Sequence, residues 1–370
     1  MFRKILCACL STLTLCFAGP VSGALAFSTP SVSWAGKPFT ESVVQQENNL
    51  YLALGPVCEK LGYQMIRRTD GTVDMIDGTL KITLDPANNR INENGHLVPT
   101  YSQSPEGTFG AGCVESGGQL CLERGLMEES FGLDISWDTK KNTVSMSPVM
   151  ENMLTVATVS ENSETPELNI NVQYPQFTSL DYPAACAKIN AVIKKEAQDA
   201  VAFGKSSAVD LEGVDFDGET RQCATWFDYS VSYNRNGLLC VVLTDYQYSG
   251  GAHGNTGQIA YTFDVKTGKE YAFGDLMKDS AYIPGVNASV RKQIDERKKS
   301  DGVVEFPDDP FKTVTAKQDF YLSNRGVVVY FQLYDHFPYA AGIQQFVVDP
   351  VALRGKLKPQ FAFLADQVRS

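Results

Sequence analysis

The chain has 370 residues, of which 43% are hydrophobic and 20% are charged. This composition is that of a soluble globular protein with enough apolar material for the cores of two domains. The formal net charge is -11. Because affinity for nucleic acid depends on clustered lysine and arginine side chains, this acidic balance argues against nucleic acid as a partner.

The N-terminal residues have the pattern of a signal peptide. Arg3 and Lys4 precede an apolar run over residues 5–18, and small residues end the segment at Ala26. We therefore expect a signal peptide over residues 1–26, either cleaved after Ala26 or retained as an anchor. No later run is long and apolar enough for an integral membrane segment. The expected location is secreted and associated with the cell wall.

Six cysteines follow the predicted signal peptide, and an even number in an exported chain favours disulfide bonds. Three precede residue 150 and three follow it, so complete pairing requires one bond between the two halves of the chain. Cys113 and Cys121 are spaced to close a short hairpin-like loop, and the other pairings stay open. None of the six has the CxxC spacing of a zinc or redox site. They are Cys58, Cys113, Cys121, Cys186, Cys223 and Cys240.

The first half of the chain contains an internal repeat with an offset of seventy residues. Each copy predicts a short strand, an amphipathic helix and two further strands. Gly62 and Gly132 stand where each helix ends, and glycine adopts the left-handed conformation of a helix end without steric cost. The matching segments are 49–55 with 119–125, 61–63 with 131–133, and 72–75 with 143–146.

This repeat resembles the copper amine oxidase N-terminal-like domain over residues 33–148. The resemblance is carried by the stretches LYLALGPVCEKLGY and LCLERGLMEESFGLDISWDTKKNTVSM. The family's usual Val-Pro-Leu-Arg at the junction of strand and helix is replaced here by residues 52–55 and 122–125. The resemblance implies a duplicated strand–helix–strand–strand unit and brings no oxidase chemistry, copper or other cofactor.

A polar stretch over residues 149–166 predicts a linker, ending at a proline. Beyond it, alternating and amphipathic patterns predict a second module over residues 167–358, in which an antiparallel sheet packs with helices. The overall fold class expected is therefore α+β with two modules. The expected helices are 182–202 and 289–297, and the expected strands are 168–174, 226–233, 238–246, 259–265, 320–322, 327–333 and 345–348.

An ordered set of motifs follows in this second module: Tyr248-Ser249-Gly250-Gly251-Ala252-His253-Gly254, residues 261–269, residues 273–276 and residues 335–342. Over residues 165–355 the chain resembles the extracellular module of RsiV-type anti-sigma factors, which also precedes the catalytic domain of PdaC-type peptidoglycan deacetylases. The resemblance implies a role at the cell wall, and in the anti-sigma members the module binds lysozyme. Neither the sigma-binding segment nor the deacetylase catalytic domain is recognisable here, so we expect a binding module without these effectors.

The expected binding residues of this module lie in two loops. In the first, glycines expose backbone amides beside an imidazole; the alternative is a structural corner that needs positive φ, with His253 bonded to a carbonyl. In the second, aromatic side chains line a groove; the alternative places Phe337 and Tyr339 in the core. The candidate residues are Tyr248, Gly250, Gly251, His253, Gly254, His336, Pro338, Tyr339 and Gly342.

Catalytic patterns are scarce in this sequence. Its three histidines, His96, His253 and His336, are isolated from one another, and no Gly-x-Ser-x-Gly elbow occurs. We therefore expect no enzyme activity, metal or cofactor, and predict an exported binding protein that contacts a lysozyme-like wall hydrolase or peptidoglycan glycan. Two alternatives remain. One is a metal-dependent envelope hydrolase or deacetylase with a divalent ion between His253 and His336, and the other is a structural wall or spore-coat protein.

Overall fold

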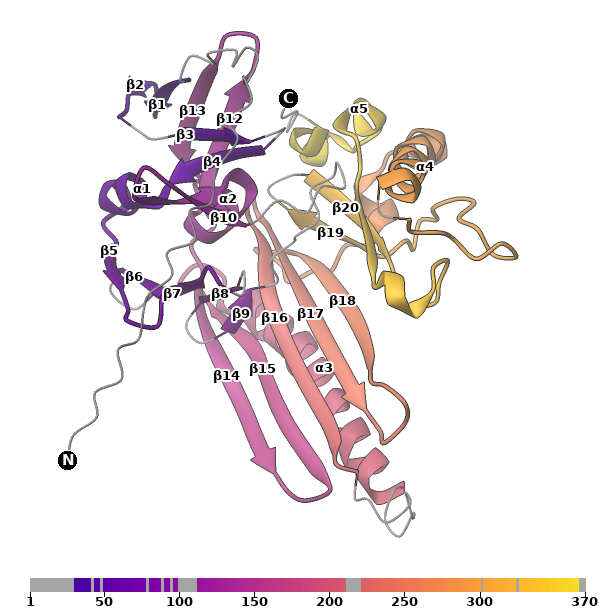
Figure 1. The fold of residues 1–370 in the computed structure, drawn as a ribbon. Helices are drawn as coiled ribbons and strands as arrows, with labels where there is room; N and C mark the ends of the chain where they lie inside the picture. The colour runs from indigo at the N-terminus through magenta and orange to yellow at the C-terminus, as the bar shows by residue number, and fades with distance from the viewer. Residues whose placement is uncertain are drawn as a thin grey trace, which may run out of the picture.

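We describe a computed structural model of the chain. It covers residues 30–40, 43–46, 49–77, 80–87, 90–93, 96–98, 112–210, 221–300, 302–323 and 326–365. The predicted signal peptide over residues 1–26 lies outside the described residues. Mixed sheets and a few helices make up the fold, which confirms the α+β class (Figure 1).

Two copies of one unit make up most of the first half. The helices are short, and each ends at a glycine in the left-handed region, with φ of 88° at Gly62 and 58° at Gly132. This confirms the predicted reason for both glycines, since a side chain there would be strained. The first copy contains β4 (Asn49–Ala53), α1 (Leu54–Leu61), β5 (Gln64–Arg67) and β6 (Val73–Asp77); the second contains β11 (Gln119–Glu123), α2 (Arg124–Phe131), β12 (Leu133–Asp138) and β13 (Thr143–Pro148).

The two copies meet through their equivalent strands. In the sheet of order β10-β11-β4-β3, β11 pairs antiparallel with β4, and Leu122 stands opposite Leu52, its own equivalent at the offset of seventy. The outer strands β3 (Val43–Gln46) and β10 (Cys113–Ser116) flank this pair symmetrically. An approximate two-fold axis therefore passes between the two leucines, which share one apolar core.

Two further sheets complete the N-terminal half. One is a meander of order β5-β6-β7-β8-β9, in which all neighbours are antiparallel. In the other, of order β12-β13-β1-β2, β1 is parallel to β13. The additional strands are β1 (Ser31–Trp34), β2 (Lys37–Pro38), β7 (Leu80–Asp85), β8 (Arg90–Glu93) and β9 (His96–Val98).

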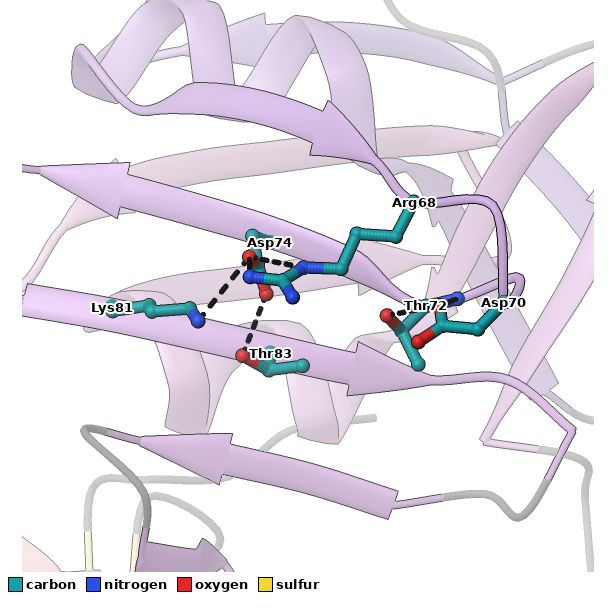
Figure 2. A network of polar contacts seen from close by, with 6 residues as sticks. All are labelled: Arg68, Asp70, Thr72, Asp74, Lys81 and Thr83. Atoms are coloured by element: carbon teal, nitrogen blue, oxygen red, sulfur yellow. Dashed lines mark hydrogen bonds and ion pairs between the residues drawn. The ribbon is translucent and has the colours of Figure 1, made fainter.

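A buried carboxylate joins two strands of the meander (Figure 2). Asp74 on β6 is 2% exposed. Its carboxylate accepts hydrogen bonds from Arg68 Nε at 2.7 Å and Thr83 Oγ1 at 2.8 Å, and pairs with Lys81 Nζ at 3.2 Å. Burial alone raises the pKa of Asp74, but the hydrogen bonds from Thr83, Arg68 and Lys81 together hold that pKa below its ordinary value.

We expect Asp74→Asn to lower the free energy of unfolding by about 1–3 kcal/mol, because charged hydrogen bonds are lost while Thr83 and Arg68 keep their donors. The folded-state pKa is depressed, so this contribution is present above the ordinary carboxyl pKa of about 4 and disappears as acid carries the pH through the lower folded value. Urea unfolding at pH 7 and at pH 3 measures both effects. The variant and parent should differ less at pH 3, and an equal difference at both values would contradict the assignment.

The second half is dominated by a five-stranded sheet of order β14-β15-β16-β17-β18 with the long helix α3 (Pro183–Asp210) against one face (Figure 1). Strands β15 and β16 are parallel, whereas the other neighbours are antiparallel. The sheet is thus mixed, not the antiparallel sheet expected, because α3 carries the chain from one end of β15 back to the start of β16. The strands are β14 (Thr155–Glu164), β15 (Leu168–Thr178), β16 (Cys223–Arg235), β17 (Leu238–Tyr248) and β18 (Asn255–Asp264).

Residues 149–166, expected as a linker, contain the edge strand β14. This strand is almost entirely exposed, and it pairs with β15 through ten residue pairs. An exposed edge strand needs no apolar alternation, so its polar composition does not distinguish it from a linker.

A separate three-stranded sheet of order β19-β20-β21 follows, packed with α4 (Ile283–Ser300) and the short α5 (Pro350–Leu353). Its strands are β19 (Phe320–Ser323), β20 (Gly326–Phe331) and β21 (Gln344–Val347). Gln332 joins the two sheets, since its Nε2 donates to the Gln258 carbonyl on β18 at 2.6 Å and its Oε1 accepts from the Gln258 amide at 3.1 Å. Burial raises the pKa of nearby Asp319, and the hydrogen bond from Gln332 lowers it in part.

The six cysteines form no disulfide among the described residues. For Cys113 and Cys121 the reason is the register. Cys113 stands opposite Leu122, the next residue after Cys121. Since successive side chains of a strand point to opposite faces, the two sulfurs lie on different faces of the sheet and the expected loop closure cannot form. Within the described residues, no helix combines the length and the apolar character needed to cross a bilayer.

Candidate functional site

The glycine loop predicted from the sequence joins β17 to β18. Gly250 is buried and has a φ of 80°, so the structural reason for a glycine holds at this position. Its carbonyl accepts a hydrogen bond from Arg221 Nη1 at 2.6 Å. The Tyr248 hydroxyl donates to the backbone carbonyl of Gly251, an exposed residue, at 3.0 Å. The strand end and the loop are thus held together by side chains on either side of the turn.

His253 and Tyr339 bring the two predicted loops into contact. Their ring centroids are 4.1 Å apart with an angle of 30° between the planes. His253 Nδ1 donates to the Gly254 carbonyl at 2.8 Å, and the Tyr339 hydroxyl donates to the same carbonyl at 2.9 Å. The carbonyl therefore uses both lone pairs, and the exposed imidazole has the local backbone bond that the structural alternative expected.

The second loop divides between core and surface. Phe337 is 1% exposed and belongs to the core around the three-stranded sheet. Pro338 is exposed and begins a single 3-10 turn over Tyr339–Ala341, which ends at Gly342 with a φ of 70°. Tyr334, half exposed, lies with its ring 5.7 Å from that of Tyr339. The core alternative is thus right for Phe337, while Tyr339 lies in the surface contact.

His336 makes its contacts apart from this pair. Its Nδ1 donates to the Asp309 carbonyl at 3.1 Å and lies 3.5 Å from Asp309 Oδ2, and its ring packs against Phe331 at 5.1 Å. Throughout the described part of the chain, no three His, Cys, Asp or Glu side chains converge in a way that could hold a metal ion. The structure therefore brings His253 and Tyr339 together and leaves His336 in a different contact.

An aromatic pair on the strands extends the glycine loop. Trp226 on β16 and Tyr246 on β17 stand opposite each other and stack with centroids 4.8 Å apart. Gly254 packs against the Tyr246 ring so closely that a Cβ there would lie 2.3 Å from Tyr246 Cζ. Both residues fall on strands expected from the sequence, and neither was singled out as a candidate binding residue. The signal was present, because Trp226 alternates with buried Thr225 and Phe227 on a strand.

The opposite face of β17 carries an acid. Burial raises the pKa of Asp245, and a hydrogen bond from Gln247 lowers it in part. Gln247 Nε2 also donates to the Ala200 carbonyl of α3 at 3.3 Å. These side chains face the helix, so they support the sheet beneath the loop and do not belong to its exposed surface.

Three family models match separate regions of the chain. Residues 34–146 match the copper amine oxidase N-terminal domain, residues 161–256 match Deacetylase PdaC, and residues 274–349 match a protein family of unknown function, DUF3298. The three regions follow one another along this one chain. The resemblances noted in the sequence are thereby confirmed. The two loops lie in the PdaC and DUF3298 regions respectively, so the contact between His253 and Tyr339 joins one region to the other.

Solved structures of the DUF3298 family are similar to part of the chain. A crystal structure of a family member from Bacteroides fragilis has 18% identity and a TM-score of 0.45, covering 59% of this chain and 98% of its own. A family protein from Pseudomonas aeruginosa has 17% identity and a TM-score of 0.40, covering 57% of this chain and 97% of its own. No curated protein matches the chain.

Proposed function

We propose that the protein is an exported, wall-associated binding protein that contacts a lysozyme-like hydrolase through its two loops and catalyses no reaction itself. The family regions support an association with the cell envelope. The observation that carries the proposal is the contact between the loops, where His253, Tyr339 and half-exposed Tyr334 present aromatic and imidazole groups together. Such groups beside glycines suit contacts with a protein surface.

The charge of the chain supports a basic partner. With a formal net charge of -11, long-range attraction would speed encounter with a cationic hydrolase and weaken as salt rises. We further propose a cleaved signal peptide over residues 1–26, a first module over residues 33–148 and a second over residues 167–358. In this arrangement the second module makes the contact.

Binding of purified lysozyme to the immobilised full chain tests the proposal. We expect Tyr339→Ala to weaken the affinity at least tenfold, because the ring stacks on His253 and its hydroxyl holds the Gly254 carbonyl. His253→Ala should weaken it by a smaller factor, and raising the salt concentration should slow association for every form.

The matched control is Leu180→Ala. Leu180 is fully exposed and precedes α3, whose first residue, Pro183, lies about 26 Å along the helix from Ala200, where the helix contacts β17. Its affinity for lysozyme should equal that of the parent. If the folded parent retains no lysozyme even at low salt, or if Tyr339→Ala binds as the parent does, the loops are not a hydrolase-binding surface.

Peptidoglycan glycan is the second partner that the family resemblance implies. Sedimentation of the chain with purified sacculi tests it, and also tests a purely structural wall role. Loop variants that still sediment with sacculi would assign wall attachment to another surface.

An enzymatic function is favoured by one observation, the description of the matching family as a deacetylase. Acetate release from peptidoglycan, measured with and without added divalent ions, tests it. Under the binding proposal neither the parent nor His253→Ala releases acetate. Metal-dependent release that both His253→Ala and His336→Ala abolish would establish the deacetylase alternative instead.

A further inference from the structure

On the face of the five-stranded sheet opposite α3, Cys240 and Val242 of β17 are buried against the three-stranded sheet, and the part around Trp226 is left exposed. The helix covers the face that contains Phe227 and Leu243. On the other face, Trp226 is 51% exposed, although its neighbours Thr225 and Phe227 are buried. A tryptophan half exposed on a regular strand leaves a large apolar ring surface in water, which is costly unless a partner covers it.

The strand register places polar side chains in line with this tryptophan. Directly opposite residues on neighbouring strands share one face of a sheet. At about 4.8 Å between strands, a row across five strands extends about 19 Å. The row that contains Trp226 is Asn162, Asn171, Trp226, Tyr246 and Thr256.

The rows on either side have a similar composition. Hydroxyl and amide groups predominate, and the charged members, Glu164 and Asp228, are both acidic. No lysine or arginine lies among these described positions, so the face lacks the cations that phosphate, nucleic acid or other polyanions require. The remaining members are Asn169, Ala224 and Tyr248 in one row, and Ser160, Gln173 and Thr244 in the other, which ends at Gln258, buried against Gln332.

Stacked aromatic rings flanked by neutral donors and acceptors fit a polyhydroxylated ligand. The C–H faces of a pyranose ring pack against an indole or phenol face, while its hydroxyls bond to amides and hydroxyls at the rim. Trp226 and Tyr246 stack with an angle of 25° between their planes, so one ring fixes the orientation of the other. The pair is therefore ordered before a ligand arrives, which lowers the entropy cost of binding.

We propose that this open face, centred on Trp226 and Tyr246, binds a neutral saccharide chain. A sugar ring stacks on the exposed Trp226 indole, and Asn171 and Thr256 bind hydroxyls of the adjoining units along the row. The site adjoins the glycine loop through Gly254, yet its contacts are distinct from those between His253 and Tyr339. This proposal rests on the proposed envelope-binding function in one respect: that function identifies the source of the saccharide.

Tryptophan fluorescence allows saccharide binding at this face to be measured directly. Trp34 and Trp137 are 9% and 8% exposed, which leaves Trp226 as the exposed member of the three tryptophans in the chain. With an N-acetylglucosamine tetrasaccharide as the probe, binding should protect Trp226 fluorescence from acrylamide quenching. The Trp226→Phe variant should lose most of the quenchable signal.

Affinity measurements by calorimetry complete the test. We expect Trp226→Ala to weaken tetrasaccharide binding at least tenfold and Asn171→Ala by a smaller factor, while Trp226→Phe, which keeps an aromatic ring, is intermediate. Thermal unfolding of each variant checks that it folds. Tyr339→Ala is the control, because it should lose lysozyme binding and keep saccharide binding.

The outcomes separate this site from the loop contact. A folded parent that binds the tetrasaccharide but no lysozyme would overturn the loop proposal alone. A folded parent that binds no tetrasaccharide, or Trp226→Ala binding it as tightly as the parent, overturns the saccharide site alone. Stronger binding of an acidic polysaccharide than of the neutral probe also overturns it.

Discussion

Replacing Gly254 by alanine should disable both proposed surfaces with one methyl group. A Cβ at this position would lie 2.3 Å from Tyr246 Cζ and 2.4 Å from Tyr246 Oη, closer than atoms can approach. The backbone there has no positive φ, so close approach is the reason for the glycine. Either the Tyr246 ring leaves its stack on Trp226, or the loop moves and displaces the Gly254 carbonyl that holds His253 and Tyr339.

The expected result for Gly254→Ala is at least a tenfold loss of saccharide affinity and a several-fold loss of lysozyme affinity, with cooperative thermal unfolding retained. Calorimetry with both ligands measures it. The rescue variant is Gly254→Ala with Tyr246→Ala, which removes the clashing ring. It should regain lysozyme binding while saccharide binding stays lost. Unchanged affinity of Gly254→Ala for both ligands would show that neither surface depends on this contact.

Local features of this chain were predictable because they depend on neighbouring residues. The repeat indicated both short helices, and Gly62 and Gly132 marked their ends, since the left-handed conformation of a helix end is a property of one residue. Strand pairing depends on residues distant in sequence. Nothing local indicated that Leu52 would pair with Leu122, or that β15 and β16 would be parallel.

The candidate site shows the same division. The glycine loop and the second aromatic loop were recognisable as motifs, and the structure brings His253 to Tyr339, which are 86 positions apart in the sequence. His336, only three positions from Tyr339, instead packs against Asp309 and Phe331. Alternation along the strand places Trp226 on the face opposite Phe227, but whether another element covers that face depends on the rest of the fold, so Trp226 was missed.

The shared core of the two repeat copies yields the second large effect, on stability. Leu52 and Leu122 are 0% and 2% exposed and stand opposite each other at the approximate two-fold axis. Truncation of either leucine to alanine should cost about 2–5 kcal/mol, through lost burial and the cavity that remains. Because both cavities open at one point, the double variant should cost less than the sum of the single variants.

Denaturant unfolding followed by fluorescence in a Trp226→Phe background tests this expectation. Trp34 and Trp137, the two tryptophans that remain, belong to the same apolar core as both leucines, so the signal reports that core. Glu59→Ala, at an exposed position of α1, is the control and should change stability by less than about 0.5 kcal/mol. If Leu52→Ala and Leu122→Ala were strictly additive, or if only one of them moved the transition, the copies would be packed as independent units. If neither copy can bury its leucine without the other, each single variant shifts one common unfolding transition, because each copy provides the apolar surface against which the other packs.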